Sequence, residues 1–348
     1  MVKYKLDTYR EVISVEEFVI RLAGHNIRVK SRFASNRGFF ADYIVPDEDA
    51  EFAVSVSDEE MKNTKNATEG LSPGRIEFTG MYRPIAEKMP FYDGLVIHGA
   101  AISYEGKGYI FTAPSGTGKT THIKAWRKFL GKSVGIVNGD KPILTVKDGT
   151  VYVHGTPWSG KERWQKNCSV PLGGICLLNR GTVNEIRPAT TDESIPFLFR
   201  QTYIPQNTDA VIKTMELMDV LLKNVPVYML YCDTSENAVK CSFERLCSKN
   251  YDDCKVRTSD MKIKSGFVLR DIAGQAVVIA TGEASKDFHG MVKLNETAKD
   301  IWQWLSDGRT VPEIAEKLAE KYSVDKSNAA ADVMEMVEKM EKAGFLES

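Results

Sequence analysis

The first 95 residues carry short runs in which apolar positions alternate with polar ones. The stretches FVIRLAGHNIRV and EFAVSVS are rich in β-branched residues and predict strands, whereas the polar EEMKNTKNATEGLSPG predicts a loop. A short helix is expected at YRPIAEKM, near Arg83 and Pro84. Residues 1–93 are therefore predicted to form a β-rich N-terminal portion.

Two apolar runs, GLVIHGAAI and GYIFTA, flank the turn YEGKG and predict a hairpin. The period then changes to that of a helix. Ile123, Trp126 and Leu130 fall on one face of this helix, and Gly131 is suited to its C-terminal cap. The pattern thus predicts a strand, the glycine-rich sequence APSGTGKTTH and a helix in direct succession.

The next segment mixes strands and amphipathic helices. SVGIVNGD predicts a buried strand that ends in Asp140, and PILTV and TVYVHG predict a hairpin around Asp148. GGICLLNR and VPVYMLY predict two further strands, and residues 208–223 and 235–248 predict helices. We therefore expect residues 1–250 to form one α/β domain.

Residues 251–262 are polar and aperiodic, which predicts a linker between domains. Residues 263–348 have a complete plan of their own, with two strands followed by three helices. Asn295 is expected to cap the first helix, and Thr310 with Glu313 forms a capping box at the second. This outline predicts a small winged-helix domain.

The composition is that of a soluble globular protein with one or two domains. Of its 348 residues, 43% are hydrophobic and 27% are charged, and the formal net charge is −1. Residues 262–348 contain 12 Lys and Arg against 15 Asp and Glu, so the winged helix lacks the basic face of a DNA reader. No apolar run approaches the roughly 20 residues that span a bilayer. We expect no nucleic-acid partner and no membrane partner.

The N-terminal sequence carries acids and lacks an apolar core, which argues against a secretory signal and predicts a cytoplasmic protein. The six cysteines form no C-x-x-C pair, so we expect reduced thiols. Four of them fall between residues 232 and 254. Their irregular spacing, with no His among them, favours partly buried thiols over a zinc site.

Residues 113–122, APSGTGKTTH, follow the phosphate-binding pattern G-x-x-x-x-G-K-[ST] except that Ala113 replaces the first Gly. Backbone N–H groups in such a loop cradle phosphate oxygens, Lys119 adds a charge, and the Thr120 hydroxyl can bind Mg²⁺. The alternative is a glycine-rich turn that binds nothing. The expected contacts to ATP, or to another nucleoside triphosphate, are Ser115, Gly116, Thr117, Gly118, Lys119, Thr120 and Thr121.

A nucleotide site of this kind needs a carboxylate to hold the metal or to take a proton. Asp140 follows an apolar strand 20 residues after Thr120, and these two residues are the predicted metal ligands. The alternative for Asp140 is an ordinary acid in a hairpin turn.

The sequence IHGAAISYEGKGYIFTAPSGTGKTTH, followed by IVNGD, resembles the core of the HPr kinase/phosphorylase family, which shares its P-loop architecture with PEP carboxykinases. The resemblance covers roughly residues 94–180. It implies that Asp140 is the general base that deprotonates a hydroxyl, with His98 beside it and Lys119 and Thr120 at the phosphates. It also implies that the chain can form a homo-oligomer.

The chain departs from this family in two places. Gly139 stands where the family has the first acid of a pair, and VPLGGICLL replaces its Glu-containing signature. A second metal ligand and a reverse, phosphorylase reaction are therefore without support.

Three further residues are candidates near the phosphates. Lys161, in HGTPWSGKERW, and Arg200 are candidate substrate or phosphate contacts, and His122 could contact the nucleotide. The alternatives are an exposed turn with packed tryptophans for Lys161, a surface helix arginine for Arg200 and a structural role for His122.

Residues from about 265 to 346 resemble PqqD, a family that includes the peptide-recognition elements of pathways for ribosomally made peptides. The resemblance implies that a leader peptide adds a strand to the edge of the small sheet, beside the third helix. Asp332, Met336 and Lys339 are candidate peptide contacts on that helix.

Together, these patterns predict an ATP-dependent kinase that phosphorylates a Ser or Thr hydroxyl of a precursor peptide, using Asp140, His98 and Lys119. Two alternatives stay open. One is a nucleotide-binding peptide chaperone or sensor without phosphate transfer. The other is an HPr-kinase-like enzyme that acts on a folded protein or a small molecule.

Overall fold

The structure is a computed structural model, in which contacts separate the described chain into two compact units, Met1–Lys255 and Val256–Ser348. We treat each unit by itself. No helix in the described part of the chain is long and apolar enough to cross a membrane. The described residues are 14–47, 49–68, 70–255, 262–272, 274–282, 284–288 and 291–347.

The linker predicted at 251–262 begins too early. Tyr251–Cys254 form a short helix, α8, in which Asn250 caps the Asp252 N–H and the Tyr251 side chain is fully buried. Burial of this large ring anchors α8 in the core of the first unit. Residues 256–261 of the predicted linker lie outside the described residues.

The N-terminal portion combines a small sheet, in the order β3-β1-β2-β4, with several helices. The β-rich prediction for residues 1–93 therefore captured the strands and α3 but missed the other helices. Its elements are β1 (Glu16–Leu22), β2 (His25–Ser31), η1 (Ala34–Tyr43), β3 (Ile44–Val45), β4 (Phe52–Val54), α1 (Asp58–Ala67), α2 (Pro73–Gly80), α3 (Tyr82–Lys88) and η2 (Met89–Tyr92).

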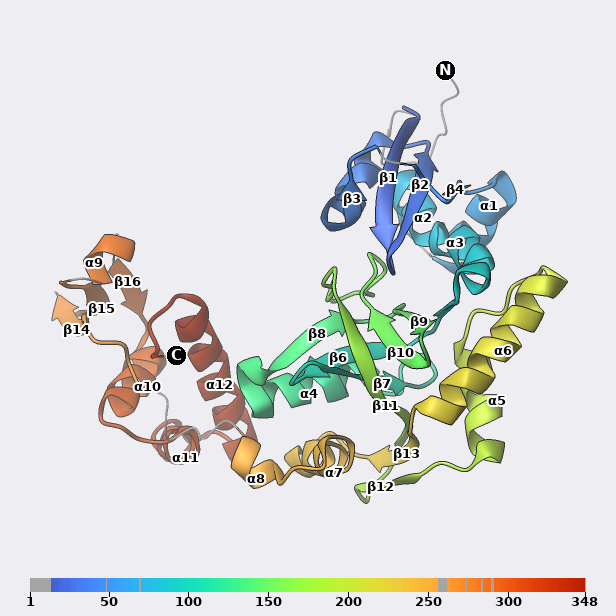
Figure 1. The fold of residues 1–348 in the computed structure, drawn as a ribbon. Helices are drawn as coiled ribbons and strands as arrows, with labels where there is room; N and C mark the ends of the chain where they lie inside the picture. Colours follow the sequence, from blue (N-terminus) through green and yellow to red (C-terminus); the bar gives the residue numbers. More distant parts are fainter. Residues whose placement is uncertain are drawn as a thin grey trace. The chain divides into compact units, whose positions relative to one another are not determined.

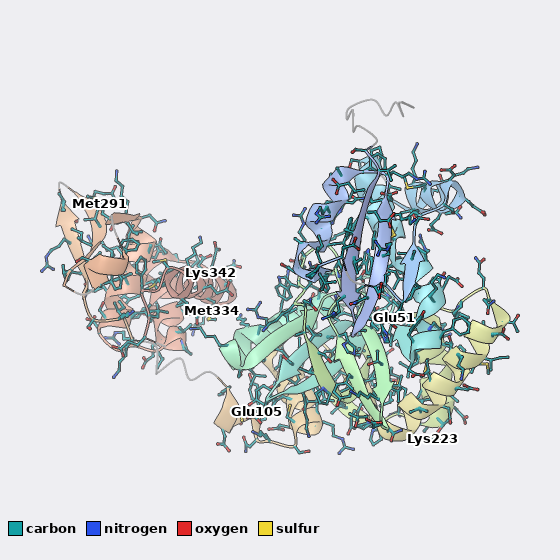
Figure 2. All side chains as sticks on the ribbon, turned by 45° about the horizontal axis from the view of Figure 1, so that its top comes forward. Glu51, Glu105, Lys223, Met291, Met334 and Lys342 are labelled. Atoms are coloured by element: carbon teal, nitrogen blue, oxygen red, sulfur yellow. The ribbon has the colours of Figure 1, made fainter. Side chains whose placement is uncertain are left out.

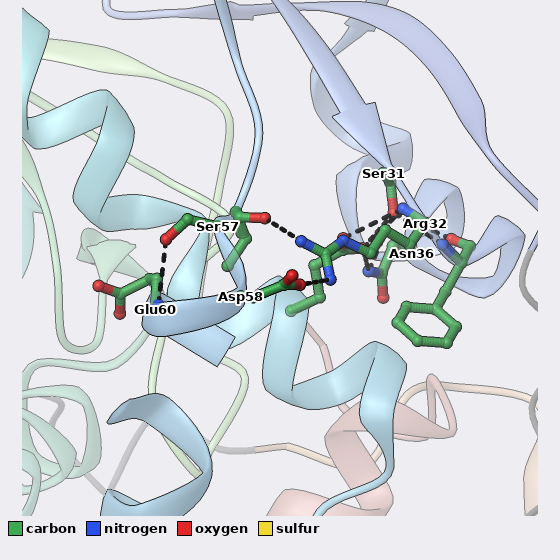
Figure 3. A network of polar contacts seen from close by, with 9 residues as sticks. Ser31, Arg32, Asn36, Ser57, Asp58 and Glu60 are labelled. Carbon is green, nitrogen blue, oxygen red and sulfur yellow. Dashed lines mark hydrogen bonds and ion pairs between the residues drawn. The ribbon is translucent and has the colours of Figure 1, made fainter. Parts of the chain in front are cut away.

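The predicted loop EEMKNTKNATEGLSPG is mostly the helix α1, which the polar pattern concealed. Its one buried residue is Thr64, so the hydrophobic period is missing. The helix begins where the Ser57 hydroxyl accepts from the Glu60 N–H, and Arg32 holds it to the sheet through Asp58 and the Val56 carbonyl (Figure 3). A cap and the ion pairs of Asp58 with Arg32 and of Glu60 with Arg83 thus replace an apolar face as the determinants of this helix.

The central sheet runs in the order β5-β9-β10-β11-β7-β6-β8, with β13 beside β11 and β12 beside β13 (Figure 1). The predicted hairpins and strands are all present. The strands are β5 (Gly94–Val96), β6 (Ala100–Tyr104), β7 (Lys107–Thr112), β8 (Val134–Asn138), β9 (Ile143–Lys147), β10 (Thr150–His154), β11 (Ser169–Arg180), β12 (Glu185–Pro188) and β13 (Val227–Cys232).

Helices cover both faces of this sheet. On one face, α4 (Lys119–Leu130) and α7 (Glu236–Cys247) share a core with β6 and β7. On the other, α5 (Thr191–Gln201) and α6 (Thr208–Asn224) pack on β5, β9 and β10. The predicted apolar face of α4 is confirmed, since Ile123, Trp126 and Leu130 are all buried.

Strand directions bring several chain segments to one edge of the sheet. β11 runs parallel to both β7 and β13, and β8 also runs parallel to β7 because each is antiparallel to β6. The carboxyl ends of β8, β7, β11 and β13 therefore meet at the edge where β6 begins. Ligands of open α/β sheets bind at such an edge.

The second unit has its own sheet, in the order β14-β15-β16, and its own buried core. The caps predicted at Asn295 and at Thr310 with Glu313 are confirmed, whereas β16 and α9 were not predicted. The elements are β14 (Phe267–Ile272), β15 (Gln275–Ala280), α9 (Ala284–Asp287), β16 (Met291–Leu294), α10 (Glu296–Ser306), α11 (Val311–Tyr322) and α12 (Lys326–Lys342).

Candidate functional site

Residues 113–118, here called the glycine-rich loop, join β7 to the N-terminus of α4. Gly116 and Gly118 have φ values of 79° and 123°, which residues with a side chain rarely adopt. Lys119 is 7% exposed, and its ammonium group donates to the carbonyl oxygens of Ala113 at 2.8 Å and Pro114 at 3.3 Å. The loop therefore curves around this cation at a helix N-terminus, an arrangement that suits an anion.

Arg180, at the end of β11, fixes the glycine-rich loop from outside. Its guanidinium donates to the carbonyl oxygens of Gly116 at 2.6 Å and Thr117 at 3.2 Å. No local sequence pattern predicts this contact, because Arg180 lies 63 residues after Thr117. Because the carbonyls are held by Arg180, the loop N–H groups keep a fixed direction.

On the β6–β8 flank of the loop, Asp140 lies between His98 and Lys141. Its Oδ1 lies 3.3 Å from His98 Nε2, and its Oδ2 lies 3.6 Å from Lys141 Nζ. The other ring nitrogen of His98 is 2.9 Å from the Gln201 side-chain oxygen. The structure thus brings together the predicted His98 and Asp140 and adds Lys141 and Gln201, which sequence reasoning missed.

Two opposing effects act on the Asp140 carboxyl. Burial raises the pKa of Asp140, but the hydrogen bond from His98 and the charges of Lys141 and Lys119 outweigh it, so the net shift is downward. For Lys119, burial lowers the pKa and the Asp140 charge partly offsets this. Asp140 is therefore an ionised carboxylate at neutral pH, within electrostatic reach of the loop lysine.

Asn138 and residues 155–166, here called the 155–166 loop, hold Asp140 in place. The Asn138 side-chain oxygen accepts from the N–H groups of Asp140 at 2.9 Å and Lys141 at 2.7 Å. Its amide group donates to Thr156 in the 155–166 loop. Asn138 is fully buried and fixes the backbone of the turn.

Gly139 has a steric explanation that the sequence did not reveal. A Cβ atom at this position would lie 2.5 Å from the Ser159 carbonyl oxygen. Gly160 of the same loop also lies close, since a Cβ added there would be 3.3 Å from the Asp140 Cβ. The 155–166 loop therefore occupies the space that an acid at position 139 would need.

We expect Gly139→Ala to lower the free energy of unfolding by about 1–3 kcal/mol, because the new methyl group must displace the 155–166 loop. Gly38→Ala is the matched control, since nothing lies within 4 Å of a Cβ there. Urea titration of both variants measures the difference. Equal stability of the two variants would show that the loop yields without cost.

The other two predicted phosphate contacts, Lys161 and Arg200, are exposed side chains. Lys161 is exposed within the 155–166 loop, and Arg200 is exposed near the end of α5, one residue before Gln201. The tryptophans flanking Lys161 are packed: Trp158 donates to the Phe78 carbonyl, and Trp164 lies under Lys124 and Arg127. Contacts from Lys161 or Arg200 to a substrate stay predictions.

On the opposite flank, between α4, the ends of β11 and β13, and α7, lies a pocket of about 350 Å³. Gly116–Gly118 and Thr121 form its side toward the loop, and Asp233 lines its far side. His122 also lines it, although the imidazole is 4% exposed and contacts Ser242 and Trp126. The candidate nucleotide contact at His122 is therefore mainly a structural residue of the α4–α7 interface.

Burial lowers the pKa of His122 from 6.5 to about 3. Between these values the unfolded chain binds a proton that the folded chain does not, so stability is lost as pH falls. Relative to His122→Gln, we expect the native chain to lose about 2 kcal/mol more between about pH 7 and about pH 5. Urea denaturation followed by tryptophan fluorescence measures this difference, and equal losses would contradict it.

The candidate peptide contacts lie on α12 of the second unit, where Figure 2 labels Met334 and Lys342. Asp332 and Lys339 are exposed, and Lys339 pairs with Glu335 at 2.7 Å. Met336 is half-buried and packs against the core. Among the described strands, β14 and β16 each pair with β15 alone, so the other edge of each has no partner strand.

Comparison with known protein families gives two matches. Residues 275–346 match coenzyme PQQ synthesis protein D (PqqD), and residues 74–246 match the SynChlorMet cassette protein ScmC. The resemblance of the C-terminal region to PqqD is thereby confirmed. No curated protein matches the chain.

Three solved structures resemble parts of the chain. A lasso peptide synthetase B1 complexed with the leader peptide is 20% identical, covering 26% of this chain and 99% of its own, with a TM-score of 0.23. TbiB1 in complex with the TbiA(beta) leader peptide is 22% identical, covering 25% and 95%, with a TM-score of 0.22. The Hpr(Ser) kinase/phosphatase from Coxiella burnetii is 10% identical, covering 44% and 93%, with a TM-score of 0.26. These TM-scores are too low to support a shared fold.

Proposed function

For a chain whose C-terminal unit contains a PqqD domain, we propose the function of an ATP-dependent kinase that phosphorylates a Ser or Thr hydroxyl of a ribosomally made precursor peptide. The observation that carries this proposal is the placement of Asp140 and Lys119. An ionised carboxylate and a loop lysine lie at one edge of the sheet, close enough to perturb each other's pKa. A phosphoryl-transfer site needs these two groups, one for the acceptor hydroxyl and one for the phosphates.

The residues present fit a magnesium nucleotide. The Lys119 ammonium group bonds to loop carbonyls from a position at the N-terminus of α4, where a phosphate oxygen could take over as its partner. Thr120 follows it on the first turn of α4, and a hydroxyl with a carboxylate is an oxygen donor set that suits Mg²⁺. Mg²⁺, held by Thr120 and Asp140, would neutralise charge on the phosphates.

In the proposed reaction, Asp140 accepts the proton of the acceptor hydroxyl. The hydroxyl oxygen then bonds to the γ-phosphorus, the bond from that phosphorus to the bridging oxygen breaks, and ADP leaves. His98 is a positioning residue, because it contacts Asp140 through Nε2 and is itself held by Gln201 through Nδ1. Lys119 and the loop N–H groups stabilise the charge on the transferred phosphoryl group.

The proposed partner follows from the C-terminal unit. The PqqD family includes peptide-recognition elements, and the edges of β14 and β16 that no described strand pairs with can accept one more strand. Leader capture by this unit would raise the local concentration of the acceptor residue for the first unit, since both belong to one chain. The reading frames that neighbour the gene for this chain are the place to look for the precursor peptide to test.

One assay distinguishes the kinase from the alternative, a nucleotide-binding peptide chaperone or sensor. Incubation of the precursor with ATP and Mg²⁺ should yield phosphopeptide and ADP in equal amounts if the chain is a kinase. A chaperone or sensor would bind both ligands and leave the peptide unmodified. An enzyme for a folded protein or small molecule would also leave this peptide unmodified.

A further inference from the structure

The pocket between α4, β11, β13 and α7 lies on the side of the glycine-rich loop away from Asp140. The order of strands is β8-β6-β7-β11-β13, with the loop following β7. Asp140 follows β8, whereas Asp233 follows β13. The two acids therefore flank the loop from opposite sides at the same edge of the sheet.

This placement orients a nucleotide held by the loop. The proposed transfer to a hydroxyl at Asp140 requires the γ-phosphate to face the β6–β8 flank. Because the phosphates form one chain, the nucleoside must then extend toward β11 and β13. A pocket of about 350 Å³ opens there, within the range of roughly 300–1,000 Å³ found for small-molecule sites.

The pocket wall has the chemistry of a nucleoside site. Ala125 and Leu178 offer apolar surface, whereas Asp233, Thr234 and Ser235 offer polar groups at the other side. The Asp233 carboxylate is fixed by the Ser235 hydroxyl at 2.6 Å and the Ser235 N–H at 2.9 Å. These hydrogen bonds lower the pKa of Asp233, so it is a hydrogen-bond acceptor at neutral pH.

We infer that this pocket binds the nucleoside of the nucleotide and that Asp233 accepts a hydrogen bond from the amino group of the base. The inference rests on the proposed function for the direction of the phosphates. It makes Asp233 a determinant of nucleotide selection, and it leaves catalysis to the other flank.

Calorimetric titration of the full-length chain tests this inference with three ligands, each with Mg²⁺. These are ATP, purine riboside triphosphate, which lacks the amino group, and inorganic tripolyphosphate, which lacks the nucleoside. Asp233→Ala should weaken ATP binding about tenfold, as expected for a hydrogen bond to a charged group, and change tripolyphosphate binding by less than about twofold. Asp209→Ala, an exposed aspartate at the start of α6, is the matched control.

Purine riboside triphosphate should bind the unaltered chain about tenfold more weakly than ATP does. Ala125→Leu provides a second variant, because it fills the pocket and should also weaken ATP binding without affecting tripolyphosphate. The inference is overturned if Asp233→Ala leaves ATP affinity unchanged, if it weakens ATP and tripolyphosphate alike, or if ATP and purine riboside triphosphate bind equally well.

The outcome is separable from that of the proposed function. Selective loss of ATP affinity in Asp233→Ala, in a chain that transfers no phosphate, would uphold the pocket and reject the kinase. Phosphate transfer to the peptide, with an ATP affinity that Asp233→Ala does not change, would uphold the kinase and reject the pocket.

Discussion

Asp140→Asn is expected to slow phosphate transfer to the precursor peptide by at least about a hundredfold, which is the usual effect of losing a general base. The amide keeps the shape of the carboxyl and cannot accept the hydroxyl proton. ATP affinity should change far less than the rate, because Lys119 and the glycine-rich loop stay intact. Single-turnover assays with saturating ATP measure the rate directly.

Asp148→Asn is the matched control for this experiment. Asp148 is exposed in the turn between β9 and β10 with a positive φ of 51°, which Asn also tolerates. It should transfer phosphate at the rate of the unaltered chain. If Asp140→Asn retains that rate as well, the proton goes to another group and the role assigned to Asp140 is wrong.

Removal of the leader from the precursor peptide should lower kcat/KM by about a hundredfold, because the acceptor residue loses its tether to the second unit. The turnover rate at saturating peptide should be little changed. Steady-state assays with the whole chain and the two peptides separate KM from kcat.

The separated leader distinguishes tethering from activation. If the leader acts as a tether, adding it as a free peptide should inhibit phosphorylation of the intact precursor by competition. Stimulation of the leaderless peptide by the free leader would instead show that leader binding activates the first unit. Equal rates with and without the leader would remove the second unit from the reaction.

The sequence predicts best where local patterns and burial agree. In α4, the residues Ile123, Trp126 and Leu130 have a helical period and are all buried, so periodicity alone locates the helix. The hairpin of β6 and β7 is equally predictable, since its turn contains Gly106, which has a positive φ. In α1, by contrast, the helix depends on the Ser57 cap and carries almost no apolar signal.

The candidate site was only partly predictable for a related reason. His98, Lys119 and Asp140 belong to short motifs that can be read locally. Gln201 reaches His98 across 103 residues, and Arg180 reaches the glycine-rich loop across more than 60, so no local pattern announces them.

The role of Gly139 also could not be predicted from the sequence. From sequence it is a missing acid, whereas the structure shows a position that the Ser159 carbonyl closes to any side chain. The charged neighbour of Asp140 in the sequence is instead Lys141, whose Nζ lies 3.6 Å from the Asp140 Oδ2. Asp140 therefore lies near two lysines, Lys119 and Lys141, and the proposed mechanism uses Asp140 and Lys119.

The most direct test of the account is mass spectrometry of the precursor peptide after incubation with this chain, ATP and Mg²⁺. The account predicts the addition of a phosphoryl group to a Ser or Thr residue, dependent on Lys119 and Asp140. An unmodified peptide, under conditions where calorimetry shows that ATP and the leader are both bound, would contradict it.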